Sequence, residues 1–124
     1  MTAQTDFWGE IVPAQERTPL AILREQASLL GTKTKNLVEA TVDTSVDARG
    51  RFVHRFTLVV PSLSSYKYEL FRIEHGVAIY PIHTSEPPAL GLETEQEFTD
   101  WLHRKLSSAE TKRIIANLLA QATS

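Results

Sequence analysis

Histidine is the side chain best suited here to acid–base or metal chemistry, and the sequence contains four. His54 stands in an alternating apolar run with Phe52 and Phe56, where its imidazole could act as a base or ligand near neutral pH. A single histidine on an apolar face is more often a hydrogen-bonded structural residue. His75 and His83 are expected at opposite ends of a short strand, roughly 20 Å apart, which is too far to share one metal ion. The sequence therefore predicts no metal site.

Other catalytic patterns are missing from the sequence. The chain has no cysteine, which excludes disulfides and thiolate chemistry. Ser62, Ser64 and Ser65 fall in an expected loop and lack the glycine context of a nucleophile elbow. The five glycines are scattered and form no phosphate-binding loop. We expect no catalytic residue and no cofactor.

The strongest binding pattern is a cluster of tyrosine and arginine. Strict alternation places Tyr66, Tyr68 and Arg72 on one face of a strand, and Tyr80 on the next strand could lie beside them. Tyrosine and arginine are common anchors of protein interfaces, and aromatic residues with arginine on a sheet also resemble an RNA-stacking platform. The same residues could be ordinary core and strand positions. We take Tyr66, Tyr68, Arg72, Tyr80 and His54 as the candidate binding residues.

Three helices are predicted around these positions. The first begins at Pro19 with Thr18 as its N-cap, and Gly31 is expected to end it. Its apolar residues recur at spacings of three and four and form one face: Leu20, Leu23, Ala27 and Leu30, widened by Ile22 and Leu29. Two capping boxes, one from Thr94 to Glu97 and one from Ser107 to Glu110, predict the later helices.

Four strands are predicted between the helices. Alternating patterns and turn residues place them near residues 37–45, 51–60, 66–74 and 77–82. Residues 83–93 contain Pro87, Pro88 and Gly91 and are expected to form an ordered surface loop. The short connections require antiparallel pairing. The sequence thus predicts an α+β fold, a four-stranded antiparallel β-meander with one N-terminal helix and two C-terminal helices packed on it.

The domain organisation follows from the same elements. Residues 1–17 are expected to be an N-terminal extension, and residues 18–122 a single α+β domain. Phe7 and Trp8 in the extension are expected to pack onto the domain or to contact a partner. The second face of the sheet would expose apolar side chains at Leu37, Val53, Val59, Phe71 and Ile73. Either the Phe7-Trp8 segment covers them or two sheets pack together, and we favour a homodimer.

Composition narrows the functional classes. The net charge of −2 offers no global field for nucleic acid, so nucleic acid is a disfavoured partner. The sequence has neither a signal peptide nor a run of about 20 apolar residues, which favours a cytoplasmic protein without membrane contact. We expect a small protein-binding module of adaptor, chaperone or inhibitor type without catalytic activity. The alternative is a small-molecule-binding or enzymatic domain with a pocket between sheet and helices, using His54 with Tyr80 or Tyr68.

Overall fold

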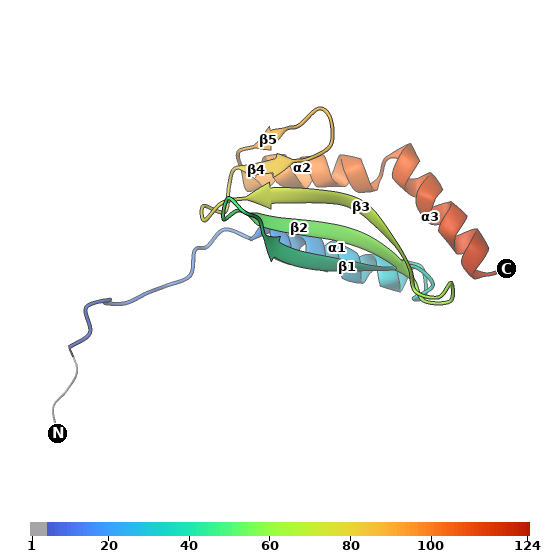
Figure 1. Cartoon of the computed structure of the whole chain (residues 1–124), viewed down its shortest axis with the longest axis horizontal. Helices are drawn as coiled ribbons and strands as arrows, with labels where there is room; N and C mark the ends of the chain where they lie inside the picture. Colours follow the sequence, from blue (N-terminus) through green and yellow to red (C-terminus); the bar gives the residue numbers. More distant parts are fainter. Residues whose placement is uncertain (1–4) are drawn as a thin grey trace, which may run out of the picture.

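The computed structural model describes residues 5–124 and contains three helices and one sheet. The helices are α1 (Pro19–Lys33), α2 (Glu95–Leu106) and α3 (Ala109–Ala122). The strands are β1 (Glu39–Val46), β2 (Phe52–Val60), β3 (Tyr66–His75), β4 (Ile82–Thr84) and β5 (Gly91–Leu92). All neighbours pair antiparallel in sequence order, so the sheet is a meander. The predicted α+β fold is confirmed, with a short fifth strand added (Figure 1).

The helices lie on one face of the sheet, which we call the inner face. In Figure 1, α1 lies behind β1 and β2, and α2 lies behind β4 and above β3 in this view. A single core joins these layers, and its fully buried members include Leu23 from α1, Phe56 and Leu58 from β2, and Phe98 from α2. Burial of such side chains contributes roughly 1.5–3 kcal/mol each. The apolar faces predicted for the helices are therefore used to cover the sheet.

A β-bulge in β3 divides the strand into two registers. Phe56 pairs with Phe71, whereas the next residue, Thr57, pairs with Glu69, so Leu70 is the extra residue. One extra residue reverses which face every following side chain takes. Strict alternation would put Phe71 and Ile73 on the second face, but the bulge brings both into the core on the inner face. Phe71 and Ile73 were expected to be exposed on the second face, but both are buried in the core of this domain.

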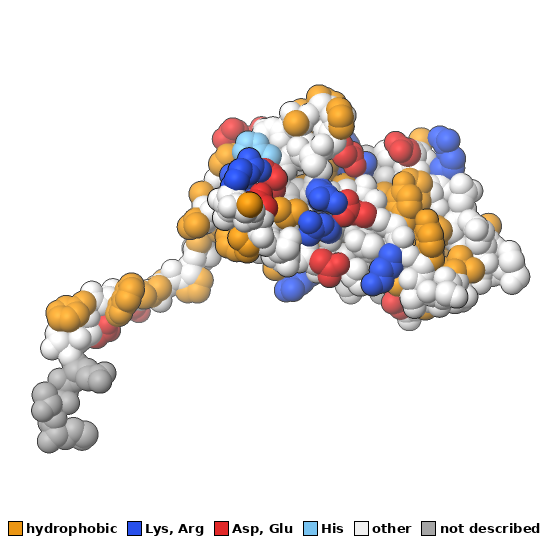
Figure 2. All heavy atoms as spheres, in the orientation of Figure 1, with side chains coloured by type: hydrophobic (Ala, Val, Ile, Leu, Met, Phe, Trp, Pro, Cys, Tyr) orange, Lys and Arg blue, Asp and Glu red, His pale blue; other side chains and the backbone are white. Residues whose placement is uncertain are grey.

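The outer face of the sheet carries charge. Arg55, Glu69 and Arg72 form ion pairs across β2 and β3, with N–O distances of 3.6 Å for Arg55–Glu69 and 3.0 Å for Arg72–Glu69. Figure 2 shows basic and acidic side chains interspersed over this face. Because these pairs are partly exposed, each contributes about 1 kcal/mol or less. The outer face is a solvated surface of mixed charge.

The first helix begins as predicted but ends later. Thr18 Oγ1 accepts a hydrogen bond from the Ala21 amide at 3.2 Å. Gly31 was expected to end the helix, but it is a buried residue within α1, and Thr34 is the C-cap. The chain reverses instead through Lys35 and Asn36, which adopt positive φ angles of 53° and 64°. The prediction for Gly31 was wrong because two non-glycine residues supply the left-handed turn.

The caps of α2 and α3 follow the predicted type with one shift. Thr94 Oγ1 accepts from the Glu97 amide at 3.1 Å, which confirms the first capping box. Ser107 was expected to cap α3, but it is the C-cap of α2. Ser108 caps α3 instead and accepts from the Thr111 amide at 3.1 Å. The tight α2–α3 connection uses both serines, one for each helix.

The end of the sheet differs from the predicted fourth strand. Residues 77–81 form a loop, and β4 covers only Ile82–Thr84, where His83 pairs with Glu74. Gly91–Leu92, expected in a loop, pairs with β4 as β5. The expected 20 Å between His75 and His83 was therefore wrong, since His83 lies opposite the neighbour of His75. The late start of β4 follows from Pro81, which has no amide hydrogen for the ladder.

The N-terminal arm, residues 5–17, extends away from the domain (Figure 1). Phe7 and Trp8 are 92% and 81% exposed, so the expectation that they pack onto this domain was wrong. The root of the arm is fixed, because the Arg17 amide donates to Glu95 Oε1 at 3.1 Å. The arm is thus an anchored extension with an exposed apolar segment.

Candidate functional site

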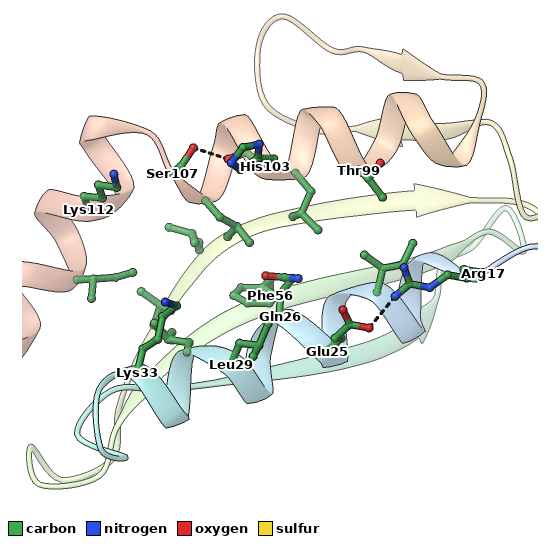
Figure 3. Close-up of a pocket in the computed structure, with 17 residues that line it drawn as sticks. Arg17, Glu25, Gln26, Leu29, Lys33, Phe56, Thr99, His103, Ser107 and Lys112 are labelled. Atoms are coloured by element: carbon green, nitrogen blue, oxygen red, sulfur yellow. Dashed lines mark hydrogen bonds and ion pairs between the residues drawn. The ribbon is translucent and has the colours of Figure 1, made fainter.

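An open groove lies on the inner face of the sheet, between α1 on one side and α2 and the start of α3 on the other. Its volume is about 560 Å³. Phe56 and Leu58 of β2 and Leu70 of β3 form the buried floor. Leu70 is the bulge residue, so the irregularity in β3 adds an apolar side chain to the groove. The helices diverge over this floor and leave it accessible from one side (Figure 3).

The walls of the groove are mainly aliphatic. From α1 come Ile22, Leu29 and Leu30, and from the opposite side Leu102, Leu106 and Ile115. Leu29 of α1 is 45% exposed and lies beside these other aliphatic side chains, so the wall is a continuous apolar patch. A concave apolar surface of this size marks a binding site more often than a packing defect.

Charged side chains define the two ends of the groove (Figure 3). Arg17 and Glu25 form an ion pair of 2.7 Å at one end and largely neutralise each other. Lys33 from α1 and Lys112 from α3 lie at the other end, and neither forms an ion pair within residues 5–124. His103 lies on the α2 rim. The open end of the groove is therefore basic.

The α2–α3 junction positions one wall. Thr111 is 1% exposed, and its hydroxyl donates to the Lys105 carbonyl at 2.8 Å. The Ser108 hydroxyl donates to Thr111 Oγ1 at 3.1 Å. These bonds satisfy groups at the end of α2 and the start of α3. They hold α3 at an angle that brings Lys112 and Ile115 to the groove.

The groove has an apolar floor and a partly polar rim. Its polar groups, such as Gln26, Thr99 and Ser107, are spread along the rim, and the floor is apolar. Ser107 donates to the His103 carbonyl at 2.6 Å, so its hydroxyl is used in capping α2. Acid–base catalysis requires polar groups that converge on one reacting atom. Within the described chain, no two polar groups converge on the floor of the groove. The groove can bury apolar surface and attract negative charge at its basic end.

The predicted tyrosine–arginine cluster is split by the bulge. Tyr68 pairs with Leu58 and Tyr66 with Val60, so both tyrosines share the inner face with the core. Arg72 pairs with Arg55 and lies on the outer face. The expectation that Tyr66, Tyr68 and Arg72 share a face was wrong, because alternation was extended across an irregular position. The two tyrosines remain partly exposed, at 47% and 37%.

Tyr80 lies in the loop between β3 and β4 and fixes the root of the arm. Its hydroxyl donates to the Arg17 carbonyl at 3.0 Å. Burial raises the pKa of Tyr80 to about 12, and the carboxylates of Glu95 and Glu16 contribute to the rise. The phenol therefore stays protonated and remains a donor. Tyr80 is a structural anchor beside the groove and is not part of its lining.

His54 belongs to a buried hydrogen-bonded chain at the far end of the sheet. Its Nε2 lies 2.9 Å from Nε2 of His75, and its Nδ1 lies 2.9 Å from Thr44 Oγ1. His75 Nδ1 lies 2.7 Å from the Gly76 carbonyl, an acceptor only, so this nitrogen carries the proton. With that proton on Nδ1, His75 accepts at Nε2, His54 donates from Nε2, and Thr44 donates to His54 Nδ1. Each ring nitrogen of His54 and His75 therefore has a hydrogen-bond partner.

The burial of His54 changes its acidity. Burial lowers the pKa of His54 to about 4, and the electrostatic influence of His75 and of the Arg24 guanidinium lowers this pKa further. The imidazole is therefore neutral at pH 7. His54 is 3% exposed and does not line the groove. The histidine pair could have been anticipated only from the β2–β3 register, which the sequence leaves open by one residue.

The groove itself had one sequence signal. Helix α1 carries more apolar residues than one stripe needs, since Leu29 lies outside the spacing of Leu23, Ala27 and Leu30. An apolar residue beyond the buried stripe indicates a second contact. Where that contact lies depends on the distance between α1 and α2, which no local pattern encodes.

Comparison with known protein families, characterised proteins and solved structures finds no match to this chain. Within residues 5–124 no group of three or more histidine, aspartate or glutamate side chains could hold a metal ion. No helix in that range is long and apolar enough to cross a membrane. The geometry of the groove is therefore the observation that bears most directly on function.

Proposed function

We propose that this domain is a protein-binding module of the adaptor, chaperone or inhibitor type that acts without catalysis. The observation that supports this most strongly is the open, leucine-lined groove between α1 and α2. Such a groove fits an apolar face of a partner chain, in the manner of helix-in-groove recognition. We include a cytoplasmic location in the proposal, since a chain without cysteine suits a reducing compartment.

The dimensions of the groove suit a short helical segment. Helix α1 has 15 residues and is therefore about 22 Å long. A partner helix of about four turns, with apolar residues at i, i+3, i+4 and i+7, covers that length. Its apolar face would contact Leu29, Leu106 and Ile115, which are all partly exposed.

The charge of the groove favours an acidic partner. Lys33 and Lys112 stand at one end without intramolecular ion pairs in the described chain. Acidic residues beside the apolar anchors of the partner would meet this end, which speeds association and selects against basic segments. Such steering weakens as salt is added, because exposed charges are screened within about 10 Å at 0.1 M.

Designed peptides test the proposal directly. Three fluorescent helical peptides would share one apolar face. Their remaining positions would carry glutamate in the first peptide, lysine in the second, and both residues in scrambled order in the third. We expect the glutamate peptide to bind most tightly by fluorescence anisotropy. Leu29→Glu places a charge on the groove wall and should weaken that binding by about tenfold or more. Two-dimensional NMR of the labelled domain would locate the shifted resonances.

A matched variant separates the groove from general surface effects. Leu90 is 39% exposed and lies in the β4–β5 loop away from the groove, so Leu90→Glu makes the same chemical change elsewhere. It should leave peptide affinity unchanged. Equal losses in both variants, or NMR shifts confined to the outer face, would contradict the proposed site.

A second candidate function is the binding of a small molecule. The groove volume of about 560 Å³ lies within the 300–1,000 Å³ that holds drug-sized ligands. The residues first considered for such a pocket, His54, Tyr68 and Tyr80, do not line it. A long-chain fatty acid, with an apolar body and a carboxylate for Lys33 or Lys112, is the probe of choice. Its binding in competition with the glutamate peptide would favour this candidate.

A further inference from the structure

The N-terminal arm carries a second apolar surface that is complementary to the groove. Phe7, Trp8, Ile11 and Val12 are 92%, 81%, 73% and 65% exposed. Four neighbouring apolar side chains on one short segment are costly to leave in water and mark an interaction surface. Figure 2 shows hydrophobic side chains along the arm, away from the domain. The arm therefore lacks a partner among the described residues of its own chain.

The spacing of these residues matches the groove. Phe7 and Ile11 are four residues apart, as are Trp8 and Val12, so all four fall on one side when the arm becomes helical. Asp6 and Glu10 fall on the opposite side. Asp6 Oδ1 already accepts from the Trp8 amide at 2.8 Å, the bond that an N-cap makes. The arm has the pattern expected of a groove ligand.

The charges of the arm and the groove are opposite. Residues 5–16 contain Asp6, Glu10 and Glu16 and no basic residue. None of these carboxylates forms an ion pair within residues 5–124, and Lys33 and Lys112 at the groove end are equally free of one. Complementary charge and complementary apolar surface thus occur on one chain.

We infer that the groove of one copy of this chain binds the arm of a second copy, in a reciprocal exchange. This occupant rests on the proposed function, because it fills the same groove. The root of the arm favours a second copy: Arg17 is held by Glu95 and Tyr80, and the arm leaves the domain from there (Figure 1). A two-fold exchange satisfies both arms and both grooves at once and forms a closed dimer.

The buried area is sufficient for a stable dimer. Phe and Trp side chains bury roughly 150–250 Å² each, so two arms supply about 600–1,000 Å² from these residues alone. The surface of two grooves adds a comparable amount. The total reaches the range of about 1,200–2,000 Å² that is typical of specific interfaces.

The mass of the protein in solution tests this inference. We expect the full chain to be dimeric by analytical ultracentrifugation at micromolar concentration. The double variant Phe7→Ala with Trp8→Ala should raise the dimer dissociation constant by about 30-fold or more, the effect of losing a hot-spot anchor. The matched control is Val46→Ala with Val77→Ala, which removes side chains that are 61% and 92% exposed elsewhere. The control should remain dimeric.

Mixing two defective variants tests the contact itself. The Phe7→Ala, Trp8→Ala variant has an intact groove, and Leu29→Glu has an intact arm. Each should be monomeric alone, and an equimolar mixture should form a heterodimer through one arm and one groove. Neither variant removes a buried core residue, so both should keep the native circular dichroism spectrum.

Several results would overturn the exchange. They are a full chain that stays monomeric, a dimer that the arm variant does not weaken, and a mixture that forms no heterodimer. A peptide of residues 5–17 that binds the arm variant but not a monomeric full chain would show that each arm fills its own groove. If the glutamate peptide binds the groove while dimerisation fails, only this inference is lost. If the full chain does not dimerise and the glutamate peptide does not bind the groove, the proposed function is lost as well.

Discussion

Acidification should destabilise this protein through His54. The pKa of His54 is lowered from 6.5 to about 4, first by burial and then by the electrostatic influence of His75 and Arg24. In the unfolded chain the imidazole titrates near its ordinary value. Between about pH 6.5 and pH 4, His54 is therefore protonated in the unfolded state but mostly neutral in the folded state. Stability is unaffected by this residue above that window and falls as the pH decreases through it.

The size of the effect follows from the gap between the two pKa values. Each unit of difference is worth about 1.4 kcal/mol, so the gap sets a ceiling of about 3 kcal/mol. Thr44, the hydrogen-bond partner of His54, is exposed, and water near it will screen part of the charge. We expect a loss on the order of 2 kcal/mol between about pH 7.5 and about pH 4.5.

Urea unfolding at several pH values measures this loss. His54→Gln cannot titrate, so its free energy of unfolding should fall less than that of the native protein over the same range. The difference between the two plots of unfolding free energy against pH gives the contribution of the His54 imidazole. His103→Gln, on the exposed side of α2, provides a matched control and should follow the native profile.

If native protein and His54→Gln lose the same stability between about pH 7.5 and about pH 4.5, the histidine does not resist protonation as its burial requires. NMR titration of the His54 ring protons gives a direct check. A midpoint near the ordinary value would refute the buried hydrogen-bonded chain.

Three further predictions concern the α2–α3 junction, the β1–β2 turn and the basic end of the groove. Thr111→Val should cost about 1 kcal/mol in thermal or urea unfolding, because the hydrogen bond from the buried Thr111 hydroxyl to the Lys105 carbonyl is lost and only the Ser108 hydroxyl still donates to that carbonyl from a side chain; an unchanged stability would show that the bond is unimportant. Gly50 has φ of 77° in the β1–β2 turn, so Gly50→Val should lower the free energy of unfolding by about 1 kcal/mol or more, and a neutral result would argue against this turn. The double variant Lys33→Glu with Lys112→Glu should abolish the preference for the glutamate peptide and reverse its salt dependence in anisotropy measurements; a preserved preference would rule out the basic end as its origin.

Local patterns were sufficient for most of the fold. Thr18 and Thr94 indicate helix starts because each side-chain oxygen accepts a hydrogen bond from a backbone amide in the first turn. The alternation in β2 identifies a strand because one face must be buried. These features depend on neighbours in the sequence, so they can be recognised without knowing what packs against them.

The candidate site was predicted less well, for an equally physical reason. Arg72 was assigned to the face of Tyr66 and Tyr68 because strict alternation has no place for the extra residue Leu70. The prediction did not bring His75 together with His54, although their Nε2 atoms lie 2.9 Å apart. Register between strands is decided by the total packing of the sheet, and a slip of one residue exchanges its faces.

The sequence by itself determined three helices, an antiparallel meander and an acidic, apolar N-terminal segment. Each of these follows from residue type and short-range spacing. Only the tertiary structure decided that α1 and α2 stand apart over Phe56 and Leu58 and that Lys33 and Lys112 meet at one end of the opening. A groove is a relation between surfaces distant in the chain, and the packing of every layer around it sets its width.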